Sequence, residues 1–292
     1  MVGYNIVVDE KFGYKMLDPI PSELELNEFY EKQYYEYMKK NETQSMGRFV
    51  NDNKSAELEL DWLKRTEYQD SYLIINKQVS NGSLLDIGCG TAEFLSYMQN
   101  NGYDVVGIEP SKIAYEKAIS KKLQVYNCGL DEFMEKNKKF DIINMTNVLE
   151  HIPNPQRTIS QCKMLLNTGG IIRIKVPNDF NELQLQIVEK TNKNKWWIAE
   201  PDHINYFNFE TLINLLNHEG FKVINKTVDF PMEFFMLMGE DYIKNKELGK
   251  LCHEKRRNFE LNIDGNLRRK IYSAYAEIGI GRNLIIYAKL EL

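Results

Sequence analysis

The segment SLLDIGCGTAEFLSYM, residues 83–98, constrains the fold more than any other part of the chain. A short apolar run ends at Asp86, glycines follow at Gly88 and Gly90, and a helix-like stretch comes next. A strand, a tight glycine turn and a helix in this order are typical of nucleotide-binding α/β folds, where the backbone of the turn approaches the ligand. We therefore expect a cofactor to lie against Gly88 and Gly90.

The residue at position 93 limits which cofactors can bind at this turn. A dinucleotide fingerprint needs a third glycine three places after the second, because a helix there packs closely on a strand under a pyrophosphate. This chain has Glu93 at that place. A carboxylate repels a pyrophosphate at a helix N-terminus, where anions are otherwise favoured. The turn therefore predicts a cofactor without phosphates at that point and disfavours an NAD-dependent oxidoreductase.

The flanking sequence predicts an α/β fold. Short apolar runs at 84–88, 104–109, 123–127, 140–145 and 171–176 alternate with helical stretches near 92–101, 111–121, 130–136 and 155–166. Strands that recur with a helix at each crossover imply a parallel sheet covered on both faces. A further helix is expected at 209–218, a strand at 221–228 and a final strand in the tail RNLIIYAKLEL.

The chain length of 292 residues suits one large domain with additions. We expect an N-terminal extension or cap at 1–80, a cofactor-binding core at 81–229, a helical insertion at 230–282 and the last core strand at 283–292. The insertion would serve as an acceptor lid or as a dimer interface. Tyr30, Tyr34 and Tyr37 recur at helical spacing and are expected to pack against the core domain, with direct contact to a ligand as the alternative.

Composition excludes several classes of partner. The net charge of −5 argues against a nucleic-acid or anionic-lipid footprint, which needs clustered Lys and Arg. The four cysteines stand far apart with no C-x-x-C pair and no His at metal-ligand spacing, so we expect no metal site. No apolar run approaches the roughly 18 residues that span a bilayer, so we expect no membrane partner and a cytoplasmic location.

Polar residues gather where the expected strands end. Glu109 lies 19 residues after Gly90, where a carboxylate can accept both hydroxyls of a ribose. Asp86 suits a cofactor that carries an ammonium and a sulfonium, which favours S-adenosylmethionine over NAD. The residues expected at the cofactor are Asp86, Gly88, Cys89, Gly90, Glu109, Pro110, Gly129, Leu130, Thr146 and Asn147.

The motifs LLDIGCGTAEFL, GIEPSKIAYEKA, FDIINMTNVLEHIPNP and LLNTGGIIRIKVPN resemble, in this order, those of class I S-adenosylmethionine-dependent methyltransferases. The resemblance covers roughly residues 80–230. It implies a doubly wound, Rossmann-like, mostly parallel seven-stranded sheet, with an N-terminal helical extension and a C-terminal helical insertion before the last strand. Ala92 stands where the family commonly has a third glycine, and an alanine should be tolerated there if the backbone keeps φ below zero.

Transfer to a hydroxyl requires a group that removes its proton. His203 is the first candidate and His151 the second, with Asp202 or Glu200 as residues that orient the base. The stretch P-x-H-x-x-Y-F, which contains Tyr206, resembles a segment that lines the acceptor pocket in sugar- and quinone-modifying members. Arg256 of the insertion is expected to bind a phosphate or carboxylate of the acceptor.

The C-terminal tract resembles that of methyltransferases encoded with bacterial surface-polysaccharide functions. The expected reaction is O-methylation of a small polar acceptor, such as a sugar, a sugar nucleotide or a phosphorylated precursor. The alternatives are a C- or N-methyltransferase, a quinone or phenol O-methyltransferase, and an inactive methyltransferase-like binding module. A homodimer is also considered.

Overall fold

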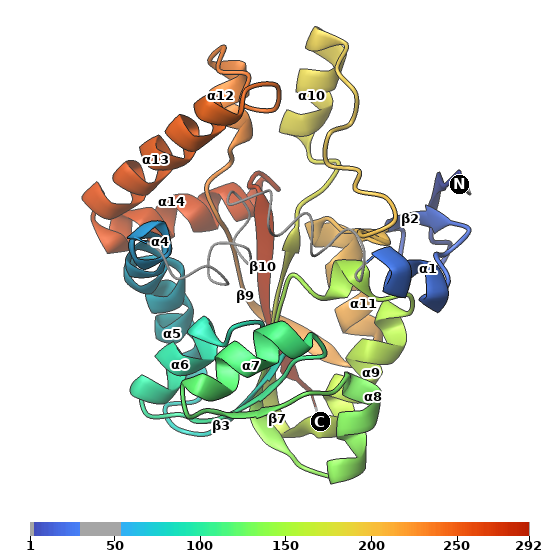
Figure 1. The fold of residues 1–292 in the computed structure, drawn as a ribbon, viewed down its shortest axis with the longest axis vertical. Coiled ribbons are helices and arrows are strands. Elements are labelled where there is room, and N and C mark those ends of the chain that lie inside the picture. Colours follow the sequence, from blue (N-terminus) through green and yellow to red (C-terminus); the bar gives the residue numbers. More distant parts are fainter. Residues whose placement is uncertain (1–2, 30–53, 292) are drawn as a thin grey trace.

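The computed structural model describes residues 3–29 and 54–291, and a seven-stranded sheet forms its centre (Figure 1). The strand order is β5-β4-β3-β6-β7-β10-β9. Strands β3 to β7 run parallel, whereas β10 runs antiparallel to both of its neighbours. The predicted mostly parallel α/β fold is therefore confirmed. The strands are β3 (Ser83–Ile87), β4 (Asp104–Ile108), β5 (Gln124–Tyr126), β6 (Phe140–Thr146), β7 (Leu166–Pro177), β9 (Phe221–Val228) and β10 (Asn283–Leu290).

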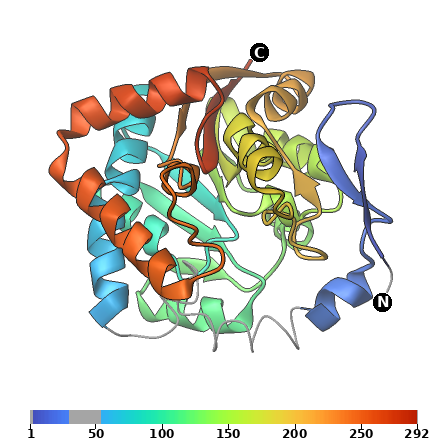
Figure 2. The ribbon, with the colours of Figure 1, turned by 90° about the horizontal axis from the view of Figure 1, so that it is seen from above.

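Helices cover both faces of this sheet (Figures 1 and 2). One face carries α5 (Glu67–Gln78), α6 (Glu93–Asn100) and α7 (Lys112–Ser120), and the other carries α9 (Pro155–Leu165) and α11 (Phe209–His218). Successive strand residues point to opposite faces, so Leu84 packs on the first side and Leu85 on the second. The short helix α8 (Leu130–Phe133) and the 3-10 turn η2 (Met134–Lys136) follow β5.

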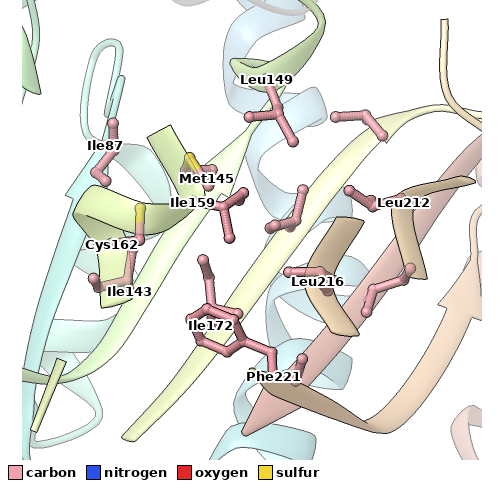
Figure 3. Packing of buried hydrophobic residues seen from close by; sticks show 14 of the residues in the cluster. Ile87, Ile143, Met145, Leu149, Ile159, Cys162, Ile172, Leu212, Leu216 and Phe221 are labelled. Atoms are coloured by element: carbon pink, nitrogen blue, oxygen red, sulfur yellow. The ribbon is translucent and has the colours of Figure 1, made fainter. Parts of the chain in front are cut away.

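The larger core lies between the sheet and helices α9 and α11 (Figure 3). Ile159 of α9 and Leu212 and Leu216 of α11 are fully buried there against the strand residues Ile143 and Ile172. Burial of one such side chain stabilises a fold by about 1.5–3 kcal/mol. This packing fixes the strand ends that carry the candidate site.

Polar caps set where several helices begin. The Asn154 side chain accepts a hydrogen bond from the N–H of Arg157 at the start of α9. Asn208 and Thr211 form a reciprocal capping box at the start of α11. Such caps satisfy backbone donors that have no partner inside the helix. Both helices consequently begin within a residue or so of the predicted positions.

The N-terminal extension is helical only in part. Strands β1 (Asn5–Val8) and β2 (Lys15–Asp18) form a hairpin, and β2 also pairs with β8 (Asn205–Tyr206). Helices α1 (Glu23–Phe29) and α4 (Lys54–Arg65) follow, and α5 completes the extension. The hairpin therefore supports the segment that contains His203. The three tyrosines expected to pack on the core, Tyr30, Tyr34 and Tyr37, lie outside the described residues.

The C-terminal insertion contains α12 (Glu233–Leu237), α13 (Lys246–Asn262) and α14 (Gly265–Glu277), while α10 (Glu182–Thr191) lies after β7. Figure 1 shows α13 beside α4 on one flank of the molecule. Within the described ranges, no helix is both long and apolar enough to cross a membrane.

A buried polar cluster joins this insertion to the extension. The Glu260 carboxylate accepts hydrogen bonds from Trp62 Nε1 at 2.7 Å and from the Tyr272 hydroxyl at 2.5 Å. Arg256, only 9% exposed, lies 3.4 Å from Glu260 and 3.4 Å from Asp229, and its guanidinium stacks over the Trp62 ring. The expectation that Arg256 binds an acceptor anion is therefore wrong. Its charge is already balanced by two buried carboxylates.

We predict that Glu260→Ala lowers the free energy of unfolding by about 3–5 kcal/mol, because it leaves Arg256 as a buried charge short of a partner. Glu254→Ala is the matched control: Glu254 is an exposed residue of the same helix, and a change within about 0.5 kcal/mol is expected. Urea unfolding followed by circular dichroism measures both. Equal stabilities of the two variants would contradict a structural role for the cluster.

Candidate active site

The glycine turn after β3 is fastened to the end of β4. The N–H groups of Gly88 and Cys89 donate to the Ile108 carbonyl at 2.9 and 3.0 Å. Gly88 has a φ of 67°, and a Cβ atom there would lie 2.6 Å from Val148 Cγ2. Glycine is therefore required at this position both by the backbone conformation and by the approach of the loop after β6.

Ala92 departs from the expected conformation. Its φ is 62° and its ψ is 34°, in the left-handed region, so the condition of a negative φ is not met. The residue ends the turn and caps α6, and its N–H donates to the Cys89 carbonyl at 2.9 Å. An alanine held in this region costs about 1–2 kcal/mol. The strain explains why a glycine is common at this place in chains with this motif.

Glu109 connects the turn to the next strand end. One carboxylate oxygen accepts the Gly90 N–H and the other accepts the Ser111 N–H, each at 2.8 Å. The side chain is 5% exposed, and burial raises its pKa. Each oxygen retains a further lone pair. The carboxylate can therefore hold the turn and still accept hydrogen bonds from ribose hydroxyls.

Asp86 lies in a buried polar network below the turn. Its Oδ1 accepts a hydrogen bond from Asn144 Nδ2 at 2.5 Å, and the Asn144 oxygen accepts one from Arg173 Nη1 at 2.7 Å. Burial raises the pKa of Asp86 to about 7, against the opposing effects of Asn144 and Arg173. A cationic ligand beside Asp86 would consequently stabilise its ionised form.

Glu67 of α5 extends the same network. Its carboxylate lies 3.1 Å from Arg173 Nη2 and 2.6 Å from Lys175 Nζ. Burial opposes ionisation of Glu67, but Lys175 and Arg173 outweigh it and hold the pKa at about 2. Sequence reasoning missed these three residues. The signal was present, because Arg173 and Lys175 are charges in an otherwise apolar strand run.

The glycine turn and the polar network of Asp86 and Glu67 line a cavity of about 160 Å³ at the carboxyl ends of the strands. It is lined by Leu63, Glu67, Tyr68, Asp86, Gly88, Cys89, Gly90, Thr91, Glu93, Phe94, Asn144, Thr146, Asn147, Arg173 and Lys175. Six of the predicted cofactor residues are among them. Glu93 is also present, and its charge is offset by an ion pair with Lys121.

The remaining predicted cofactor residues lie at the adjoining strand ends. Asn127 Nδ2 donates to the carbonyls of Glu109 and Pro110 at 2.8 and 2.9 Å, which ties the ends of β4 and β5 together. Gly129 and Leu130 open α8, and a Cβ atom on Gly129 would meet no heavy atom within 4 Å. The backbone at Gly129 is therefore accessible to a ligand.

The predicted catalytic residues come together beyond β6. His151 belongs to the 3-10 turn η3 (Leu149–His151), and its Nδ1 lies 2.8 Å from the Asp202 carbonyl and 3.1 Å from Asp202 Oδ1. The rings of His151 and His203 meet edge to face at 4.9 Å. Sequence reasoning missed Glu150, whose Oε1 lies 3.8 Å from His151 Nε2.

Burial and neighbouring charges shift the pKa values of this cluster. Burial raises the pKa of Glu150 to about 7. Burial opposes protonation of His151, but hydrogen bonds that His151 donates to Asp202 and the charge of Glu150 raise its pKa to about 9. Burial and the charge of His151 lower the pKa of His203 to about 4. His203 is therefore a neutral imidazole near pH 7.

Glu200 and Tyr206 do not line the cofactor cavity. Glu200 borders a separate open pocket of about 680 Å³ together with Lys193 and Lys195. Tyr206 is buried and packs edge to face on Phe180 at 5.9 Å. Both residues nevertheless belong to the loop and strand that carry His203.

We predict that affinity for S-adenosylmethionine rises with pH through the pKa of Asp86. Below about pH 7 this carboxyl is protonated and no longer attracts an ammonium or sulfonium, whereas above it the charge is present. Calorimetry should show about a tenfold weaker affinity at pH 6 than at pH 8. Asp86→Asn should bind more weakly and lose this dependence. A flat profile in the unaltered protein would count against contact between Asp86 and the cofactor.

Comparison with known proteins adds to this geometry. A family model described as "Methyltransferase domain" matches residues 62–226. A ubiquinone biosynthesis O-methyltransferase of Coxiella burnetii is 34% identical over 93 residues, 30% of this chain and 40% of that protein. Its counterpart from Aromatoleum aromaticum is 30% identical over 120 residues, 39% of this chain and 47% of that protein. The chain thus matches less than half the length of these relatives.

Solved structures share the fold at low identity. A SAM-dependent methyltransferase from Archaeoglobus fulgidus aligns with a TM-score of 0.54 and 17% identity, over 88% of this chain and 100% of that one. The 1,6-didemethyltoxoflavin-N1-methyltransferase of Burkholderia thailandensis, solved with S-adenosylhomocysteine, aligns with a TM-score of 0.53 and 11% identity over the full length of both. The family match covers more than half of the chain and includes the glycine turn with both carboxylates. The chain therefore belongs to the methyltransferase domain family.

Proposed function

We propose that this chain transfers the methyl group of S-adenosylmethionine to a hydroxyl of a small acceptor. The observation that carries the proposal is the position of His203. It contacts His151, which lies four residues after Asn147 of the cofactor cavity. Its Nδ1 is buried and has no hydrogen-bond partner among residues 3–29 and 54–291. A hydroxyl that lies between this nitrogen and the transferred methyl would satisfy it.

In this proposal the cofactor lies across the strand ends. The ribose hydroxyls bind Glu109, and the adenine lies beside Pro110, Gly129 and Leu130. The methionine part lies over Asp86 and reaches toward Asn147. Methyl transfer from a sulfonium is an in-line displacement, so the main contribution of the protein is orientation.

His203 then accepts the proton of the acceptor hydroxyl. The oxygen attacks the methyl carbon, the bond from that carbon to sulfur breaks, and S-adenosylhomocysteine leaves as a neutral thioether. Asp202 holds His151 through its carbonyl and carboxylate oxygens. His151 in turn packs against His203 and positions it. A positioned base contributes about 10²- to 10⁴-fold to rate.

Two acceptor classes have support. The names of the ubiquinone biosynthesis relatives favour a phenol or quinol. Aromatic side chains near His203 agree with a flat acceptor, since Tyr206 and Trp197 pack around Phe180. We therefore place a phenolic hydroxyl first.

Support for a sugar acceptor comes from buried polar atoms. Nε1 of Trp196 and Trp197, Oε2 of Glu233 and Oδ1 of Asp241 are buried and have no hydrogen-bond partner in the described part of the chain. A polyhydroxylated acceptor supplies both donors and acceptors for such atoms. The surface-polysaccharide role belongs to this second candidate. The homodimer and the cytoplasmic location remain predictions.

An acceptor screen tests the proposal. Catechols, quinols, hexoses and sugar nucleotides are incubated with the protein and S-adenosylmethionine, and mass spectrometry measures S-adenosylhomocysteine and the methylated product. We predict turnover of a hydroxyl acceptor. Cofactor binding without turnover of any member of either class would favour an inactive binding module.

On the acceptor found, we predict that His203→Ala lowers kcat by about 10²- to 10⁴-fold and changes cofactor affinity little, because His203 acts on the acceptor. His218→Ala is the control, since His218 is exposed on α11, packed against Phe12. Full activity of the His203 variant would remove that residue from the reaction.

A further inference from the structure

Glu150, His151 and His203 form a compact set of metal-ligating groups beside the cofactor cavity. Each residue offers one potential ligand atom, and these three atoms all lie within 4.8 Å of one another. The loops that carry them are joined, because the Ile204 N–H donates to the Glu150 carbonyl at 2.8 Å. Asn205 Nδ2 also donates to the Ile152 carbonyl at 2.7 Å. The backbone therefore holds the three side chains together without a ligand.

Two atoms of the set are buried without a hydrogen-bond partner in the described ranges. They are Oε2 of Glu150, whose side chain is 1% exposed, and Nδ1 of His203. A buried polar atom left without a partner costs about 1–3 kcal/mol. Two such atoms in one cluster indicate that a ligand completes it. A cation satisfies a carboxylate oxygen and an imidazole lone pair at the same time.

The orientation of His151 points to the same conclusion. Both groups near its Nδ1, the carbonyl and carboxylate oxygens of Asp202, are hydrogen-bond acceptors. Nδ1 therefore carries the hydrogen, and Nε2 is directed toward Glu150. A carboxylate that holds the far nitrogen of a histidine is the usual support of a metal-binding imidazole.

The gap between His151 Nε2 and Glu150 Oε1 is 3.8 Å. This is too long for a hydrogen bond. Two ligands that bind one ion at about 2.1 Å lie about 3.4 Å apart in a tetrahedral site. A small closure of the two side chains would therefore bring both atoms onto a common ion.

We propose that Glu150, His151 and His203 bind a divalent transition-metal ion, with Asp202 as the residue that orients His151. Two imidazoles and one carboxylate suit zinc, manganese, cobalt or ferrous iron and leave at least one coordination position open. This proposal revises the expectation of no metal site. That expectation considered the spacing of cysteines and histidines along the sequence, whereas these ligands come from two loops about 50 residues apart.

The open position would take the acceptor oxygen, a step that rests on the proposed function. The ion lowers the pKa of the bound hydroxyl, whose proton passes to water. The oxygen then attacks the methyl carbon as before, and S-adenosylhomocysteine leaves. When the ion is bound, His203 serves as its ligand, so the proton no longer passes to that nitrogen.

Metal titration of the full chain tests the proposal without cofactor or acceptor. The protein is treated with a chelator, dialysed and titrated with Co²⁺, whose visible absorption reports its coordination, and with Zn²⁺ by calorimetry. We expect one ion per chain, and no thiolate charge-transfer band, since the four cysteines are not ligands in this proposal. Glu150→Gln and His203→Ala should each weaken binding at least about 100-fold, and Asp202→Asn about 10- to 100-fold. The control His218→Ala should bind as the unaltered protein does.

Absence of stoichiometric binding, or binding that Glu150→Gln and His203→Ala leave unchanged, would overturn the proposal and indicate an adventitious ion only. Thermal unfolding and calorimetry with S-adenosylmethionine show whether each variant is folded. If Glu150→Gln does not fold, His203→Ala decides the outcome. Failure of the metal site and failure of methyl transfer are distinguishable, because the titration requires no turnover and the acceptor screen can be run after chelation.

Discussion

The hydrogen bonds that Glu109 accepts from Gly90 and Ser111 fix the geometry on which the rest of the site depends. A single carboxylate at the end of β4 holds the backbone of the neighbouring glycine turn and the start of α7. Both glycines in that turn have positive φ, and an alanine with positive φ follows them. Interactions from the adjacent strand therefore keep a costly backbone conformation in place. The same interactions place a negative charge where a ribose is expected.

The charges below the turn form a connected series and not isolated pairs. It runs from Asp86 through Asn144 to Arg173, and then through Glu67 to Lys175. Each buried charge thus has a partner, as burial requires. Because Glu67 begins α5, the series also attaches the N-terminal helices to the cofactor cavity. Helix α5 is consequently part of the site and not only a cover for the sheet.

The fold could be predicted because apolar runs of the right length alternate with amphipathic segments, and the strand ends followed from that pattern. Ala92 and Arg256 were misjudged for a common reason. The φ of Ala92 depends on the path of a turn held by β4, and the environment of Arg256 depends on Asp229 and Glu260. Likewise, nothing local in the sequence places Glu67 beside Lys175. Such features arise from tertiary contacts between distant residues.

Cofactor binding at this site requires that the carboxylates at the ends of β3 and β4, with a bare glycine turn between them, bind the adenosyl sulfonium. A crystal structure with S-adenosylhomocysteine is the decisive test. We expect the ribose hydroxyls to lie within hydrogen-bond distance of Glu109 and the amino group to point toward Asp86. An adenosyl group bound away from the turn, or a Glu109 side chain that makes no contact with the ribose, would show that the cofactor binds elsewhere.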